Sequence, residues 1–157
     1  LRPRLDWCDL GDVVECALAA TREARRNHPV SVSLPPDYPL VKADFSLMEQ
    51  VLVNLLLNAC VHTPAGTPMT LKGGADPVRG QVWLDVHDLG PGIPPELAES
   101  IFERFWTTRP GGLGLGLPIV RGFMEAQRGT VTLVPVPAGT CFRLVLPLVE
   151  HDHVPEE

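Results

Sequence analysis

The stretch VLVNLLLNACVH (51–62) decides the fold, because it combines the apolar pattern of a core helix with two asparagines. The pattern predicts a helix over 45–62, for which Asp44 is the expected N-cap. An amide that is buried without a partner costs about 1–3 kcal/mol. Asn54 and Asn58 therefore need a partner or a ligand if this helix lies in the core.

The two asparagines belong to a polar stripe on the expected helix. Residues four apart lie on the same side of a helix, so the stripe comprises Gln50, Asn54, Asn58 and His62. The opposite, core-facing side comprises Val51, Leu52, Leu55, Leu56 and Ala59. Uncharged amide oxygens, together with water and substrate phosphates, are ligands that Mg²⁺ takes. The spacing alone leaves open a second explanation, a polar face capped by a neighbouring loop.

The order of the other expected elements predicts the fold class. Helices are expected over 9–27, 93–105 and 116–127, and strands over 30–34, 39–44, 68–73, 81–88, 130–136 and 139–148. This order predicts an α+β protein, a two-layer α/β sandwich. Its sheet would be mixed but mostly antiparallel, and helices would cover one face.

Composition favours one compact domain and argues against a basic nucleic-acid surface. The chain has 157 residues, of which 45% are apolar, and a net charge of −6. Its four cysteines show neither a C-x-x-C pair nor zinc-ligand spacing, so free thiols in a reducing compartment are expected. The absence of a run of about 18 apolar residues argues against a transmembrane helix. Because the first residues lack both a methionine and the pattern of a signal peptide, we expect a fragment of a longer protein.

Two glycine-containing segments are candidates for a ligand site. DLGPGIPPE (88–96) follows an expected strand, and Gly90 and Gly92 would let the backbone turn sharply and approach a flat ligand. The carboxylate of Asp88 could accept a hydrogen bond from an amino group such as that of adenine, or it could cap the next helix. GGLGLGLPIVRG (111–122) places N–H groups before a helix, where phosphate is attracted, although a flexible loop would have the same composition. This spacing fits neither G-x-G-x-x-G nor a Walker A loop.

Five segments, in this order, resemble the motifs of histidine kinases. They are MEQVLVNLLLNACVHTP (48–64) for the N box, DLGPGIP (88–94) for the first glycine box, IFERFWTT (101–108) for the F box, GGLGLGLPIVRGFMEAQRGT (111–130) for the second glycine box and GTCFRLVLP (139–147) for the closing strand. The resemblance covers residues from about 10 to 148 and implies the ATP-binding catalytic domain of two-component sensor histidine kinases. That domain has the Bergerat fold and belongs to the superfamily shared with DNA gyrase, Hsp90 and MutL. LDVHDLGPGIPPELAESIFERF (84–105) further resembles sensor kinases of the Kdp potassium-uptake type.

The resemblance implies a role for each candidate site residue. Asn54 and Asn58 would hold the Mg²⁺ that bridges the ATP phosphates, and Asn54 would also be catalytic. Asp88 would bind the amino group of adenine. The remaining nucleotide-binding residues would be Gly90, Gly92, Ile93, Phe105, Gly112, Gly114, Leu115, Gly116, Leu117 and Thr140. Of these, the glycine and leucine residues from 112 to 117 would hold the phosphates, and Phe105, with Phe102, would anchor the lid.

The chain also departs from the family pattern at the ends of the polar stripe. The family commonly has Lys or Arg and then Tyr where this chain has Val61 and His62, so a phosphate-binding cation is absent from the helix. Arg109, in a short lid, is the candidate contact for the γ-phosphate, or else a solvated loop charge. ATPases of the superfamily have a glutamate at the position of Gln50, and a glutamine cannot act as a base. The sequence therefore favours phosphoryl transfer over hydrolysis.

The resemblance implies a protein histidine kinase that binds Mg-ATP and transfers the γ-phosphate to a histidine on a separate dimerisation domain. None of the five histidines here has the sequence context of that acceptor, so the fragment is expected not to autophosphorylate alone. The expected partners are the upstream domain and the receiver domain of a response regulator, with no nucleic acid and no direct membrane contact. The expected location is cytoplasmic, in a parent protein attached to the inner membrane.

The expected domain division is a linker over 1–9, the catalytic domain over 10–148 and a disordered tail over 149–157. Two other functions remain open from the sequence. One is a non-catalytic nucleotide-sensing or protein-interaction module of the same fold, and the other is a serine kinase of the anti-sigma type.

Overall fold

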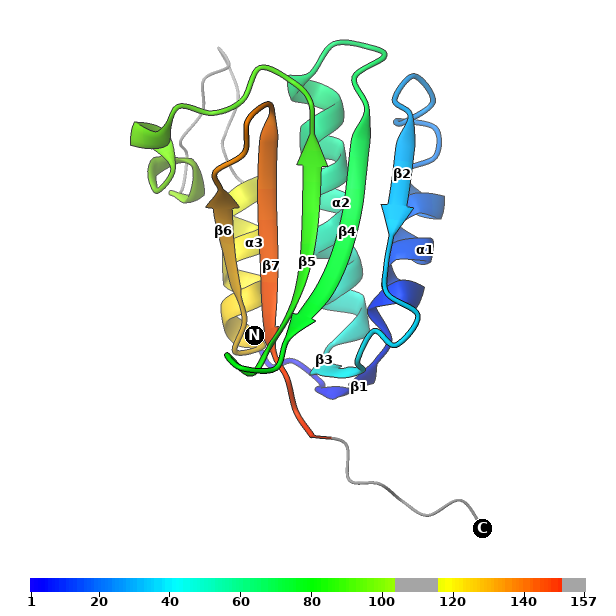
Figure 1. Cartoon of the computed structure of the whole chain (residues 1–157), viewed down its shortest axis with the longest axis vertical. Coiled ribbons are helices and arrows are strands. Elements are labelled where there is room, and N and C mark those ends of the chain that lie inside the picture. The colour runs from blue at the N-terminus through cyan, green and yellow to red at the C-terminus, as the bar shows by residue number, and fades with distance from the viewer. Residues whose placement is uncertain (104–115, 151–157) are drawn as a thin grey trace.

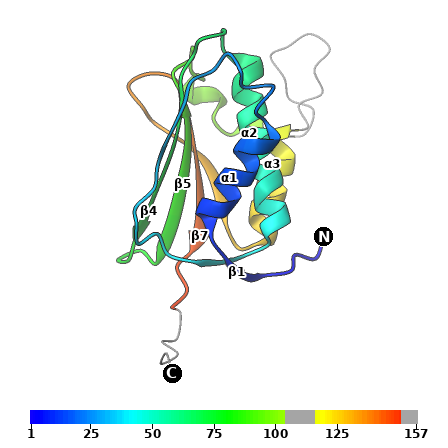
Figure 2. The same cartoon turned by 90° about the vertical axis from the view of Figure 1, so that its right-hand side faces the viewer.

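The computed structural model describes residues 1–103 and 116–150, which fold into two layers (Figure 1). Helices α1 (Leu10–Ala20), α2 (Phe45–His62) and α3 (Gly116–Ala126) form one layer. All three lie on the same face of a sheet, as the side view shows (Figure 2). The structure confirms the expected α+β two-layer sandwich.

The sheet contains five strands in the part of the chain that the structure describes. Their order across the sheet is β2 (Val30–Ser33), β4 (Met69–Asp76), β5 (Gln81–Asp88), β7 (Thr140–Pro147) and β6 (Thr130–Val134). Strands β2 and β4 are parallel, and the other neighbouring pairs are antiparallel. The sheet is therefore mixed and mostly antiparallel, as expected. Because β5 lies between β4 and β7, its end at Asp88 is paired on both sides, with Met69 and with Thr140.

Helix α2 is the central element of the core. The side chain of Asp44 accepts a hydrogen bond from the Leu47 N–H at 3.2 Å, so the expected N-cap is confirmed. The buried residues of α2 are Leu47, Met48, Val51, Leu52, Leu55, Leu56 and Ala59, which include the whole predicted core-facing side. By length and composition alone α2 could cross a membrane. Its buried face and its packing against α1 and α3 account for the apolar composition instead.

Helix α1 ends at Ala20, whereas the sequence pattern predicts a helix that continues to residue 27. The hydroxyl of Thr21 donates to the Ala17 carbonyl at 2.8 Å and so competes with the backbone N–H groups of a further turn. The guanidinium of Arg25 donates to the Leu18 carbonyl at 2.6 Å and caps the helix end. These two side chains terminate the helix.

The helix expected over 93–105 is not an α-helix in its described part. Two short 3₁₀ helices, Pro95–Leu97 and Ser100–Phe102, occupy the segment. Pro94 and Pro95 cannot donate backbone hydrogen bonds, and the tighter turns that follow place Ile101 and Phe102 in the core.

The structure has a second sheet of two strands, and the sequence predicts only one of them. Strand β3 (Val41–Ala43) is the expected one. Its antiparallel partner, β1 (Asp6–Cys8), lies in the segment that the sequence predicts to be a linker. A strand of only three residues is too short to leave a clear pattern.

Candidate functional site

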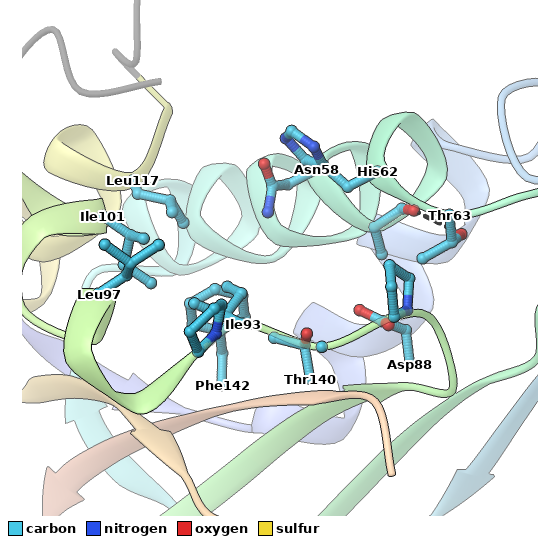
Figure 3. A pocket seen from close by; sticks show the side chains of 14 residues that line it. Asn58, His62, Thr63, Asp88, Ile93, Leu97, Ile101, Leu117, Thr140 and Phe142 are labelled. Atoms are coloured by element: carbon cyan, nitrogen blue, oxygen red, sulfur yellow. Dashed lines mark hydrogen bonds between the residues drawn. The ribbon is translucent and has the colours of Figure 1, made fainter. Parts of the chain in front are cut away.

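A pocket of about 250 Å³ lies where the C-terminal half of α2 faces the ends of β5 and β7 (Figure 3). Its lining residues are Asn58, Ala59, His62, Thr63, Asp88, Pro91, Gly92, Ile93, Pro94, Leu97, Ile101, Leu117, Thr140 and Phe142. Asn58 and His62 lie on the α2 side, and Asp88 and Thr140 lie on the sheet side (Figure 3). Segments far apart in the sequence thus meet in one pocket.

Asp88 ends β5 and is the charged residue of the pocket floor. The residue is only 7% exposed, and its Oδ1 atom accepts a hydrogen bond from the Gly90 N–H at 2.9 Å. Burial raises the pKa of this carboxyl, while the Gly90 N–H and the nearby His87, His62 and His28 oppose the shift. A buried acceptor in an apolar pocket is suited to recognise a single donor group on a ligand.

Gly90 and Gly92 are required by the space around them. A Cβ on Gly90 would lie 2.5 Å from Cγ2 of Thr63, at the end of α2. Gly92 has a φ of +83°, which L side chains rarely adopt, and a Cβ there would lie 3.0 Å from the Gly139 carbonyl oxygen. The backbone after Asp88 can therefore pass close to α2 and leave room for a ligand.

The polar stripe of α2 divides at the pocket. Asn58 and His62 line the pocket, whereas Asn54, one turn earlier, is half-buried and is not among the described residues that line it. Gln50, at the start of the stripe, is exposed. The structure thus brings one of the two candidate magnesium ligands together with Asp88, and it places the other next to it along the helix.

Apolar side chains form a slot between the two polar sides of the pocket. Ile93 was expected here, but Leu97, Ile101 and Phe142 were not. Phe142 follows Thr140 by two residues on β7, so the strand's alternation could have indicated it. These apolar walls are suited to the flat faces of a heteroaromatic ring.

The two ends of the pocket carry further predicted residues. Thr140 is 9% exposed and pairs with Asp88 across β5 and β7. Leu117 lines the pocket from the first turn of α3, and Gly116 begins that helix. The remaining predicted residues, Phe105, Arg109, Gly112, Gly114 and Leu115, lie outside the described residues.

The donor set of the site fits a magnesium nucleotide. The pocket combines a buried carboxylate, an apolar slot and the amide of Asn58 on its α2 side. In the described part of the chain no group of three or more His, Cys, Asp or Glu residues could hold a metal by itself. Amide oxygens with phosphate and water oxygens are instead the shell typical of Mg²⁺ bound through its substrate.

Comparison with known families agrees with this geometry. Residues 43–150 match the family described as histidine kinase-, DNA gyrase B- and HSP90-like ATPase. A probable sensor histidine kinase, TcrY of Mycobacterium tuberculosis, is 36% identical over 89% of this chain and 30% of its own length. The sensor protein KdpD of Escherichia coli is also 36% identical, over 90% of this chain and 16% of its own length. The expected similarity to Kdp-type sensors is confirmed, although TcrY has the same sequence identity to this chain as KdpD.

Solved structures extend the similarity to three dimensions. The mycobacterial sensor histidine kinase MprB has a TM-score of 0.80 and 31% identity, over 92% of this chain and 97% of that one. Full-length ShkA in complex with AMPPNP has a TM-score of 0.79 and 27% identity, over 94% and 32%. Histidine kinase ThkA in complex with the response regulator protein TrrA has a TM-score of 0.78 and 26% identity, over 92% and 42%.

Proposed function

Because the chain belongs to the histidine kinase-, DNA gyrase B- and HSP90-like ATPase family, we propose that it binds Mg-ATP and transfers the γ-phosphate to a histidine. The acceptor would lie on a separate dimerisation domain of a sensor kinase. The observation that carries the proposal is the buried carboxylate of Asp88 at the floor of an apolar pocket. The chain spans under a third of the length of TcrY and KdpD, so the activity of the whole protein is part of the proposal.

Adenine fits the chemistry of the pocket. Its ring would lie in the slot that Ile93 and Phe142 line, and its amino group would donate to the Asp88 carboxylate. A base without that amino group would leave the buried carboxylate unpaired, which is costly. Thr140, beside Asp88 on the neighbouring strand, supplies a hydroxyl at the same end of the pocket.

The phosphates would extend from the base toward α2 and the start of α3. Asn58, with Asn54 one turn away, would hold Mg²⁺ through amide oxygens. When bound, the metal would neutralise charge on the phosphates during transfer. Arg109 and the glycines Gly112 and Gly114 are proposed contacts on sequence grounds.

The rest of the proposal concerns partners and location. We expect the acceptor histidine upstream in the same polypeptide and the phosphate to pass on to a response regulator receiver domain. The complex of ThkA with TrrA supports that pairing for a similar kinase. The domain would be cytoplasmic, in a parent protein attached to the inner membrane, as the sensor function of the relatives suggests.

A reconstituted phosphoryl-transfer assay tests the proposal. The chain is mixed with γ-labelled ATP, with and without the native upstream helices attached. Label that appears only with those helices, and that is lost in acid but kept in alkali, is the expected result. Acid-stable label would indicate the serine kinase instead. Label on the isolated chain would contradict the expectation that the acceptor lies elsewhere.

One observation favours the alternative, a nucleotide-sensing or protein-interaction module. Val61, which precedes the pocket residue His62 in the chain, is 54% exposed and stands at a position where the family commonly has a basic residue. Among the described residues that line the pocket, none is Lys or Arg. ATP binding without any labelled product in the reconstituted assay would support this alternative.

A further inference from the structure

The turn between β6 and β7 packs directly on the backbone of Asp88. Gly139, the last residue of this turn (135–139), has a φ of +81°. A Cβ on Gly139 would lie 1.8 Å from the carbonyl oxygen of Asp88 and 2.9 Å from Cα of Leu89. Both are backbone atoms that cannot rotate away, so a side chain here would displace either the turn or Asp88.

The same turn also contacts Gly92, which lines the pocket in the loop after β5. The carbonyl oxygen of Gly139 would lie only 3.0 Å from a Cβ on Gly92, and Thr140 pairs with Asp88 across the two strands. The turn therefore packs against both the end of β5 and the loop that follows β5. A shift of the turn would be transmitted to the carboxylate and to the pocket wall.

A hydrogen bond from the His87 side chain connects the turn to β5, on the face of the sheet opposite to the Asp88 side chain. Its Nε2 atom lies 2.9 Å from the carbonyl oxygen of Ala138. Because a carbonyl can only accept, Nε2 must carry the proton and donate. Side chains alternate along a strand, so the His87 ring lies on the face of β5 away from the Asp88 side chain and the pocket.

We propose that the 135–139 turn positions the carboxylate of Asp88, with Gly139 and His87 as the positioning residues that set selectivity for the base. This inference rests on the proposed function, because it assumes that Asp88 binds adenine. Neither residue lines the nucleotide pocket, so each would act through Asp88. Hydrogen bonds weaken steeply with distance and angle, and a displacement of about 1 Å is sufficient to lose one.

The test compares the affinities for ATP and ITP, which share the triphosphate but differ in the amino group of the base. Gly139→Ala is the main variant, and Gly80→Ala is its matched control. Gly80 also has a positive φ, +65°, but a Cβ there would contact nothing within 4 Å, and it lies in the β4–β5 turn at the far end of the sheet. The control therefore reproduces the backbone strain without the contact with Asp88.

A second pair of variants avoids any steric clash. His87→Leu removes the donor to Ala138, and His87→Gln keeps an N–H donor at a similar reach. Both variants lack the imidazole, so the difference between them reports the loss of the hydrogen bond to the Ala138 carbonyl.

We expect Gly139→Ala and His87→Leu to lower the preference for ATP over ITP by about tenfold or more, and His87→Gln to restore it. Gly80→Ala should lower the melting temperature but keep the preference within about twofold of the wild type. Equal preferences in Gly139→Ala and Gly80→Ala would overturn the inference. If Gly139→Ala does not fold, an unchanged preference in His87→Leu overturns it. A wild type without any preference for ATP would instead contradict the proposed function, and the inference with it.

Discussion

The Oδ1 atom of Asp88 accepts a hydrogen bond from the backbone N–H of Gly90 at 2.9 Å. This bond restricts the rotation of the Asp88 carboxylate, on a residue that is only 7% exposed. Its donor, Gly90, must be a glycine because a Cβ there would collide with the Thr63 side chain. The turn that follows β5 therefore both makes room for a ligand and orients the carboxylate that we propose recognises it. An oriented, partly desolvated acceptor loses little entropy when a ligand binds.

Asp88→Asn should weaken ATP binding by about 10- to 100-fold, since a hydrogen bond to a charged group contributes about 1.5–3 kcal/mol. The amide oxygen of the variant can still accept from Gly90, so the local backbone should stay in place. Isothermal titration calorimetry with ATP and the far-ultraviolet circular dichroism spectrum check the two parts. An unchanged affinity would contradict the assignment of the base-recognising residue.

The same substitution should not lower stability at neutral pH. Because burial raises the pKa of Asp88 in the folded state, the folded protein binds a proton more readily than the unfolded chain does. The raised pKa therefore contributes stability that is present below the unfolded pKa, near 3.9, and is lost as the pH rises through the higher folded value. We expect the stability of Asp88→Asn relative to the wild type to rise over that interval. Urea unfolding from pH 4 to 7 measures it, and a relative loss of stability with rising pH would exclude a raised pKa.

Asn58→Ala should reduce the Mg²⁺-dependent part of ATP affinity by about tenfold, because it removes a proposed oxygen ligand from the pocket side of α2. Asn54→Ala should have a similar effect if its amide reaches the same ion. The affinity for ATP in excess EDTA should change little in either variant. Titrations with and without Mg²⁺ measure the difference.

Gln50→Ala is the matched control for the two asparagine variants. It removes an amide from the same stripe, but Gln50 is exposed at the far end of the stripe from the pocket. Its Mg²⁺ dependence should equal that of the wild type. If all three variants lost affinity equally, general damage to α2 would explain the result better than metal binding.

The sequence predicted the local features of the site and not its non-local contacts. Residue spacing placed Asn54 and Asn58 opposite the core face of α2, and strand alternation placed Asp88 at the end of β5, because both depend on a regular period. The contact of Gly139 with the Asp88 backbone joins residues about fifty positions apart and left no periodic signal. Only the tertiary structure shows why that position needs a glycine.

Two further features that the sequence did not predict also depend on side-chain contacts outside any regular pattern. The side chain of Gln127, at the end of α3, accepts from the Asp44 N–H at 2.7 Å and so joins the start of α2 to α3. The early end of α1 depends on Arg25, whose guanidinium reaches back seven residues to the Leu18 carbonyl. These side chains act through long-range or irregular contacts, which a pattern of apolar residues does not contain.

Arg143→Leu should lower the free energy of unfolding by about 1–3 kcal/mol without changing the affinity for ATP. Arg143 binds both oxygens of Asp85 at 2.7 and 2.9 Å and lies over the Trp83 ring, on the face of the sheet away from the helices. Its loss leaves the carboxylate of Asp85, whose side chain is 11% exposed, without its ion pair. Urea unfolding and ATP titration measure the two quantities.

Arg79→Leu provides the comparison for that prediction. Arg79 and Asp76 form an exposed ion pair at 3.7 Å in the β4–β5 turn, so its loss should cost about 0–1 kcal/mol. Equal losses in the two variants would show that burial of the Asp85 carboxylate does not strengthen its pair. A fall in ATP affinity in Arg143→Leu alone would show that the outer face of the sheet is coupled to the pocket.

The four cysteines should differ sharply in their reaction with iodoacetamide. Burial, with nearby carboxylates, raises the pKa of Cys8 to about 11 and that of Cys141 to about 12, and burial also raises the pKa of Cys60. At pH 8 the thiolate fraction of Cys8 and Cys141 would be about 10⁻³ to 10⁻⁴. The exposed Cys16 should therefore be modified first, and Cys8 and Cys141 only after denaturant is added. Mass spectrometry of the digested protein over time checks this order, and rapid labelling of native Cys141 would show that the outer face of the sheet opens in solution.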